Sequence, residues 1–266
     1  MGFLMSSFKK ALLENRLERN NRMEIKSNLS FLVNVNGWRK GCVHVVLGTT
    51  SSGKSTLVRS IIHDILANND KVNVSLFLSE ETSDDYSLEL YRAFRNLEYQ
   101  DRVNFYSEQD VLDLNKSRAL LEEAFADKSE VIIYDNLTTS MVYGEKYESQ
   151  SECAIRLKTA TKKSNKAFVA IAHTNNVIKN SRDLIDSGSV RGSKTISNIA
   201  EFFFINHQIS CDDNLFNFIQ IEKHRNQRPE DKFFRLNYDE RRSIFKNCTP
   251  VSFNDFKEIW KIRDKL

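Results

Sequence analysis

The stretch Gly48-Thr49-Thr50-Ser51-Ser52-Gly53-Lys54-Ser55-Thr56 has the pattern G-x-x-x-x-G-K-S/T and directly follows the apolar run 42–47. Two glycines allow a loop so tight that successive backbone N–H groups point at a β-phosphate, and the next helix directs its positive dipole end to the same place. A strand-like run precedes the loop and a helical pattern follows it at residues 56–62. This context is the one the motif requires, so we expect an ATP site with Mg²⁺.

Each position of this stretch has an expected part in the site. Lys54 would neutralise the β- and γ-phosphate oxygens, and the Ser55 hydroxyl would bind Mg²⁺. The expected nucleotide contacts are Gly48, Thr49, Thr50, Ser51, Ser52, Gly53, Lys54, Ser55 and Thr56.

Composition favours one substantial domain. The chain has 266 residues, 40% of them hydrophobic, which is enough for a real core. The apolar runs are far shorter than a membrane span, and residues 1–5 are too few for a signal sequence. Four widely spaced cysteines indicate neither a zinc site nor a disulfide framework. We expect a protein that does not enter membranes, located in the cytoplasm of a bacterial cell or a phage-infected host.

Strand and helix patterns alternate from residue 42 onward, which predicts an α/β fold with a mostly parallel central sheet. The expected strands are 42–47, 72–78, 103–106, 131–134 and 167–172. The expected helices are 54–67, 84–97, 114–126 and 151–163. Three further strands at 201–206, 217–222 and 232–236, joined by turn-rich links, predict a C-terminal β-meander.

The N-terminal region has a different character. Residues 6–23 lack Pro and Gly and place Phe8, Leu12, Leu13 and Leu17 at near-helical spacing, which predicts an amphipathic helix. Residues 1–40 hold eight Lys/Arg and three Glu, so 8 − 3 = +5 of charge lies there, although the whole chain carries only +3. A solvated helix face explains this charge as well as a nucleic-acid contact does. We divide the chain into an N-terminal arm at 1–27 and a main domain at 28–266.

Two acidic positions follow predicted strands. Asp135 ends the apolar run 131–134, where a metal-side acid on a neighbouring strand would bind water on Mg²⁺. Glu80 and Glu81 follow the strand that comes after the loop's helix, where a carboxylate could polarise water for attack on a γ-phosphate. The same acids could instead complement a helix dipole, with Thr82 and Asp85 as a capping box. Both interpretations can hold at once, with one glutamate as the base and the other at the helix start.

His173 follows the strand 167–172 and reaches the sheet edge where ligands bind in open α/β folds. A histidine there could sense the γ-phosphate, or it could be structural. The next segment, 176–194, lacks an apolar pattern, so it is either a mobile surface loop or a loop that grips an anionic polymer. Its candidate DNA contacts are Lys179, Arg182, Arg191 and Lys194.

Two cations end a later strand. Alternation along the strand predicts that Lys223 and Arg225 share one face. They are either an ordinary exposed strand end or a finger pair that reaches a γ-phosphate held by an adjacent subunit.

Five segments carry a family resemblance: Asn36-Gly37-Trp38-Arg39-Lys40-Gly41, Leu78-Ser79-Glu80-Glu81-Thr82, Ala172-His173, Val190-Arg191-Gly192-Ser193 and Lys223-His224-Arg225-Asn226. With the phosphate loop, they resemble the motor domain of the ring-forming replicative DNA helicases, of the DnaB type and the T7-like phage and mitochondrial type. The resemblance covers about residues 36–240 and implies the RecA-like P-loop NTPase fold. Several of these motifs also occur in other RecA-like ATPases, including recombinases and circadian-clock ATPases.

The resemblance implies a role for each candidate. It makes Glu80, rather than Glu81, the catalytic base, Asp135 the Walker B acid and His173 the γ-phosphate sensor. Lys223 and Arg225 would act in trans. The arm at 6–23 stands where the family has a linker helix that docks on the adjacent subunit. The family's Gly after Arg-Asn is Gln227 here, and we expect no counterpart of the family's N-terminal primase or primase-binding domain.

We therefore expect an ATP-dependent helicase motor, a hexameric ring that moves on single-stranded DNA during replication. The DNA would be held by the 176–194 segment and by a second loop near residues 143–147. A primase or a loader protein is a possible partner. Two alternatives stay open: a RecA-like DNA-dependent ATPase of recombination or regulation that does not unwind, and a nucleotide-bound adaptor that loads another helicase through residues 1–25.

Overall fold

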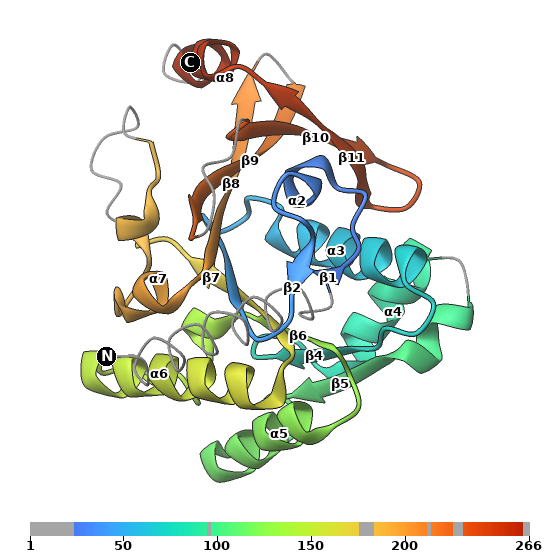
Figure 1. The fold of residues 1–266 in the computed structure, drawn as a ribbon, viewed down its shortest axis with the longest axis vertical. Helices are drawn as coiled ribbons and strands as arrows, with labels where there is room; N and C mark the ends of the chain where they lie inside the picture. The colour runs from blue at the N-terminus through green and yellow to red at the C-terminus, as the bar shows by residue number, and fades with distance from the viewer. Residues whose placement is uncertain (1–23, 95–96, 176–183, 212–213, 226–230, 263–266) are drawn as a thin grey trace, which may run out of the picture.

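The centre of the molecule is a nine-stranded sheet with helices on both faces, seen in a computed structural model (Figure 1). The structure describes residues 24–94, 97–175, 184–211, 214–225 and 231–262. The strand order is β11-β10-β9-β8-β3-β7-β6-β4-β5. The expected α/β fold with a mostly parallel sheet is confirmed, whereas the helix expected at 6–23, Lys179 and Arg182 lie outside the described residues.

Six of the nine strands form the parallel part of the sheet. Their bounds are β3 Val43–Gly48, β4 Val74–Leu78, β5 Val103–Ser107, β6 Val131–Asp135, β7 Ala167–His173 and β8 Phe202–Cys211. Every pairing among them is parallel. Their carboxyl ends therefore share one edge, which we call the carboxyl edge, and their amino ends share the opposite one, the amino edge.

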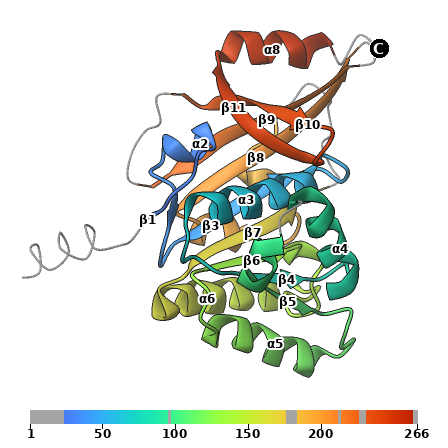
Figure 2. The same ribbon diagram turned by 90° about the vertical axis from the view of Figure 1, so that its right-hand side faces the viewer.

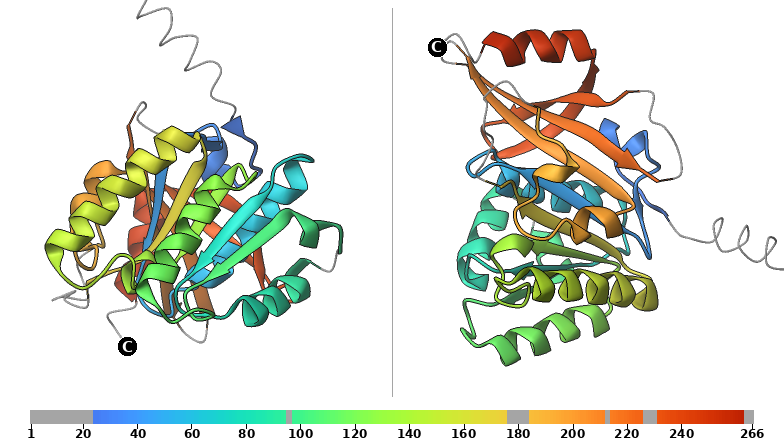
Figure 3. Two further views of the ribbon diagram at one scale, coloured as in Figure 1. Left: turned by 90° about the horizontal axis from the view of Figure 1, so that it is seen from below. Right: turned by 90° about the vertical axis from the view of Figure 1, so that its left-hand side faces the viewer.

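Alternation along the strands divides the core into two layers. Val46, Leu76 and Ile133 pack in a cluster with residues of α3 and α4, and their neighbours Val45 and Ile132 pack in the other cluster, with residues of α5 and α6. The helix bounds are α3 Lys54–Asn68, α4 Ser83–Phe94, α5 Leu114–Ala126 and α6 Tyr147–Ser164. Figures 2 and 3 show the two helical layers on opposite faces of the sheet.

An antiparallel extension completes the sheet. It consists of β9 Asn214–His224, β10 Phe233–Asp239 and β11 Ile244–Val251, followed by α8 Phe253–Ile262, which lies at the end of the molecule farthest from α5 (Figure 1). The expected meander is confirmed, with one more strand than expected. β11 escaped prediction because it alternates weakly and contains Pro250, which an edge strand tolerates. Ser252 accepts a hydrogen bond from Asp255 N at 3.1 Å and so caps α8.

The shorter elements lie around this framework. They are β1 Glu24–Ile25, α2 Ser30–Val33, β2 Trp38–Arg39, α7 Thr195–Ile199 and the 3-10 helices η1 Leu97–Arg102, η2 Leu137–Thr139 and η3 Ser187–Ser189. Strand β1 pairs with β2, and Ile25 is part of the main core, although it precedes our domain boundary at residue 28. No helix among the described residues is long and apolar enough to cross a membrane.

Candidate functional site

The glycine loop, residues 48–53, joins the carboxyl end of β3 to the first turn of α3. Gly53 has φ of 81°, in the left-handed region that favours glycine. A Cβ atom added at Gly48 would lie 2.6 Å from Ser52 Oγ and 3.1 Å from the backbone oxygen of Asn206, so both neighbours would have to shift to make room for it. Asn206, on β8, also donates a hydrogen bond of 2.7 Å to Ser52 O. Both glycines are therefore needed for this tight turn, as the sequence predicts.

Lys54 is buried at the start of α3. Its Nζ donates to Thr49 O at 2.5 Å, so the ammonium lies against the loop that precedes it. Burial lowers the Lys54 pKa to about 8, and the nearby carboxylates of Asp135 and Glu80 oppose that shift. Ser55 and Thr56 follow in the first turn and are partly exposed.

Hydrogen bonds join the carboxyl ends of β4, β6 and β7. Ser79 N donates to Asp135 O at 2.9 Å, and Ser79 Oγ donates to Asn136 O at 2.7 Å. His173 N donates to Thr138 Oγ1 at 3.0 Å. One expectation needs correction: β6 does not neighbour β3, because β7 lies between them. The strands β3, β7 and β6 all end at the carboxyl edge. The Asp135 carboxylate is therefore near enough to raise the Lys54 pKa.

The acidic side chains here influence one another. Burial raises the Asp135 pKa to about 7, and the negative charges of Glu81 and Glu80 add to the shift, while Lys54 opposes it. A cation close to the Asp135 carboxyl group would stabilise its ionised form. Among the described residues, no group of three or more His, Cys, Asp or Glu side chains could hold a metal ion.

Glu80 and Glu81 have different surroundings. Glu80 Oε1 lies 3.6 Å from His173 Nε2, and the interaction with His173 is the main cause of the lowered Glu80 pKa. The Glu81 pKa is raised, first by burial and then by Glu89. Thr82 and Asp85 form the predicted helix cap, with Asp85 N donating to Thr82 Oγ1 at 3.2 Å. The glutamate that contacts His173 is therefore Glu80.

The described part of the predicted DNA segment begins at residue 184. Arg191 N donates to His173 O at 2.9 Å, and Thr174 forms a β-bridge with Val190. The side chains of Arg191 and Lys194 are exposed. Because the backbone of this segment is bonded to the end of β7, it lies directly beside His173.

Lys223 and Arg225 lie at the amino edge. His224 pairs with Phe202, which pairs with His44, and Gly48 is four residues further along β3. At about 3.3 Å per residue, these cations are therefore about 13 Å or more from the glycine loop of their own chain. The structure brings Lys54, Glu80, Asp135 and His173 together and keeps Lys223 and Arg225 apart from them.

The buried acids Glu201 and Glu108 were not singled out by the sequence analysis. Glu201 precedes β8 and binds Lys158 and Arg225. Glu108 follows β5, and Met141 N donates to its Oε2 at 3.0 Å and Ser140 Oγ to its Oε1 at 2.7 Å. The signal for Glu201 is an acid inside the apolar run 199–205, whereas Glu108 stands in a polar stretch that offers none.

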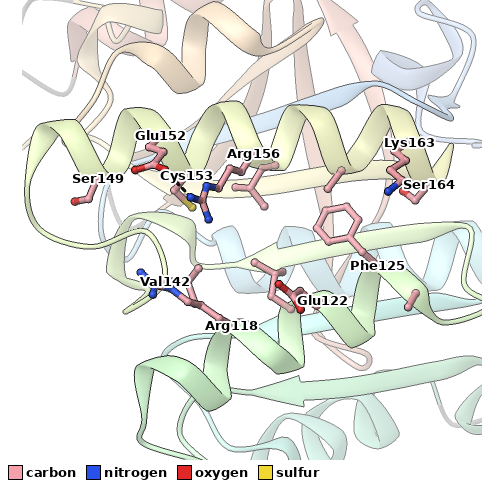
Figure 4. Close-up of a pocket in the computed structure, with 14 residues that line it drawn as sticks. Arg118, Glu122, Phe125, Val142, Ser149, Glu152, Cys153, Arg156, Lys163 and Ser164 are labelled. Carbon is pink, nitrogen blue, oxygen red and sulfur yellow. Dashed lines mark hydrogen bonds and ion pairs between the residues drawn. The ribbon is translucent and has the colours of Figure 1, made fainter.

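A groove of about 630 Å³ runs between α5 and α6 (Figure 4). Its floor includes Leu121, Phe125 and Leu157, and Glu152 and Arg156 pair on its rim. The groove lies on the face of the sheet rather than at the carboxyl edge, so it is separate from the Lys54 cluster. The second predicted DNA loop, 143–147, overlaps the start of α6, because that helix begins at Tyr147 rather than at the expected residue 151.

Comparison with protein-family models matched no family, and comparison with curated proteins gave no match.

Proposed function

We propose that this chain is an ATP-dependent DNA helicase motor of the RecA-like P-loop type. It would hydrolyse ATP between the subunits of a hexameric ring and move on single-stranded DNA. The observation that carries the proposal is the cluster of Lys54, Glu80, Asp135 and His173 beside the glycine loop. A phosphate loop, two acids and a histidine at one sheet edge are the groups that nucleotide hydrolysis requires.

The chemistry follows from these side chains. Phosphate oxygens would replace Thr49 O as the partner of the Lys54 ammonium. A water molecule would attack the γ-phosphorus, and the bond from that atom to the β–γ bridging oxygen would break, giving ADP and phosphate. Glu80, whose pKa is lowered, is ionised at neutral pH and would accept the proton of the attacking water.

Mg²⁺ fits the donor set. Ser55 and Asp135 would hold it together with phosphate oxygens and water, since this ion uses one or two carboxylates and keeps several waters. Burial and the negative charges of Glu81 and Glu80 raise the Asp135 pKa, and a cation beside Asp135 would offset both. When bound, the ion supplies positive charge that stabilises the triphosphate.

The neighbouring subunit would complete the site. Lys223 and Arg225 are too distant to reach the phosphates of their own chain, yet both belong to a motif that the helicase resemblance assigns to γ-phosphate contact. In a ring, the amino edge of one subunit would face the carboxyl edge of the next. Lys223 and Arg225 would then contact the γ-phosphate bound by that next subunit.

The segment whose backbone is hydrogen-bonded to His173 would bind the DNA. Arg191 and Lys194 are exposed cations on this segment, and the backbone bond from Arg191 N to His173 O joins it to the proposed γ-phosphate sensor. Such binding would use DNA phosphates and weaken with salt. We propose a replicative role in the cytoplasm of a bacterial cell or a phage-infected host, with a primase or loader as partner.

Strand displacement on a forked duplex, with mass measurement in the presence of nucleotide, tests this proposal. The expected result is ATP-dependent displacement by a ring-sized assembly. DNA-stimulated hydrolysis without displacement would favour the recombination or regulatory ATPase. Nucleotide binding without hydrolysis would favour the loading adaptor.

A further inference from the structure

Glu201 occupies the turn between α7 and β8, with a side chain only 10% exposed. Its Oε2 accepts a hydrogen bond from Val43 N at 2.9 Å. Its Oε1 contacts both Lys158 Nζ and, at 3.3 Å, Arg225 Nη1. One buried carboxylate therefore connects the first residue of β3 to two cations from other elements.

Arg225 is attached to Glu201 twice. Besides the side-chain contact, Arg225 N donates to Glu201 O at 3.0 Å. The Arg225 side chain is nevertheless 54% exposed. Its guanidinium thus extends from a buried anchor toward the surface, and the planar fork leaves other N–H groups for a second anionic partner.

Lys223 is held by a different acceptor. Its Nζ donates to Ser197 O at 2.9 Å, within α7. Burial and the charge of Arg225 both lower the Lys223 pKa. Lys223 and Arg225 therefore do not compete for Glu201. Of these two side chains, Arg225 is the one that contacts the Glu201 carboxylate.

We infer that Glu201 is a positioning residue for Arg225, holding its guanidinium in the orientation that reaches the γ-phosphate of the adjacent subunit. This inference rests on the proposed function. A long side chain on an exposed strand end samples many rotamers, and a buried, fixed carboxylate selects among them before the subunits meet. Val43 N and Lys158 keep that carboxylate in place.

Glu201→Gln tests the inference, because glutamine keeps the shape but loses the charge that orients Arg225. We expect kcat for ATP hydrolysis to fall roughly 10- to 100-fold, with nucleotide affinity unchanged. Glu222→Gln is the matched control, since Glu222 lies on β9 beside Lys223 and accepts a hydrogen bond from Gln220. The control should keep the wild-type kcat. A wild-type kcat in Glu201→Gln would overturn the inference.

Mixed assemblies separate positioning from a structural role. Lys54→Ala subunits should hydrolyse almost no ATP but would present an intact Arg225 to a neighbour. Added to Glu201→Gln subunits, they should raise turnover above that of either variant alone. Lys54→Ala/Arg225→Ala subunits should give no such rise. Equal turnover in the two mixtures would contradict positioning in trans.

A second variant covers the case in which Glu201→Gln does not fold. Glu201→Gln/Lys158→Met removes both members of the buried pair, so neither of these two sites keeps a buried charge, and Arg225 loses its Glu201 partner at a half-exposed position. The expected kcat and mixing results are the same. If Arg225→Ala itself keeps full activity, the proposed function fails. If Arg225→Ala is inactive while both Glu201 variants turn over normally, only the positioning role fails.

Discussion

His173 Nε2 lies 3.6 Å from Glu80 Oε1, so the ends of two strands that are not neighbours in the sheet meet above β6. The same histidine receives a backbone hydrogen bond from Arg191. The contact therefore connects the proposed catalytic base to the segment proposed to bind DNA. It also distinguishes Glu80 from Glu81, which neighbours Arg59 and Glu89.

Glu80→Gln should abolish hydrolysis and spare binding. Without the carboxylate, the attacking water loses its proton acceptor, and we expect kcat to fall by about 10²- to 10⁴-fold. Nucleotide affinity, measured by fluorescence with a labelled ATP analogue, should stay within a few-fold. Glu81→Gln is the matched control and should keep most of the activity. The opposite ranking of the two variants would assign the base to Glu81.

Lys54→Ala should weaken nucleotide binding. Loss of a buried ammonium that meets phosphate oxygens removes a charge-assisted contact of about 1.5 to 3 kcal/mol, which corresponds to roughly 10- to 150-fold in affinity. Calorimetric titration with a non-hydrolysable ATP analogue measures this change. Lys71→Ala, in the turn after α3, should bind like wild type. Equal affinities in all three proteins would remove the glycine loop from the nucleotide site.

Asp135 should make the protein less stable as the pH rises. Its pKa is raised from an ordinary 3.8 to about 7, so between these values the folded chain retains a proton that the unfolded chain has lost. The stabilisation is complete below about pH 4 and disappears as the pH passes about 7. Asp135→Asn should show a smaller decline of melting temperature over this window. Mg²⁺ with nucleotide should also reduce the decline in wild type. Parallel curves for variant and wild type would refute the shift.

Glu108→Ala should destabilise the fold. The carboxylate accepts hydrogen bonds from Ser140 Oγ and Met141 N, and its removal leaves these donors without that partner. We expect a loss of about 3 kcal/mol in the free energy of unfolding, measured with urea. Glu123→Ala, at an exposed position on α5, should change it by less than about 0.5 kcal/mol. Equal stabilities would show that the Glu108 contacts contribute nothing.

Local patterns predicted the parallel sheet and the glycine loop, because strand alternation and loop spacing are encoded over a few residues. Strand order was not accessible in this way, so the insertion of β7 between β3 and β6 was missed. Strand β11 was missed because an edge strand accepts polar residues and Pro250. Glu201 was missed because its partners, Val43, Lys158 and Arg225, come from distant parts of the chain. Long-range pairing of buried charge has no local signature.

Mixing two inactive variants tests the shared site most directly. Lys54→Ala lacks a working phosphate loop, and Arg225→Ala lacks the proposed finger, so each protein alone should hydrolyse almost no ATP. In a mixed ring, the intact glycine loop of some Arg225→Ala subunits would lie beside the intact Arg225 of a Lys54→Ala neighbour. We predict that ATP turnover, measured with single-stranded DNA present, rises well above the sum of the separate proteins. Turnover that stays at that sum would contradict a hydrolysis site shared between subunits.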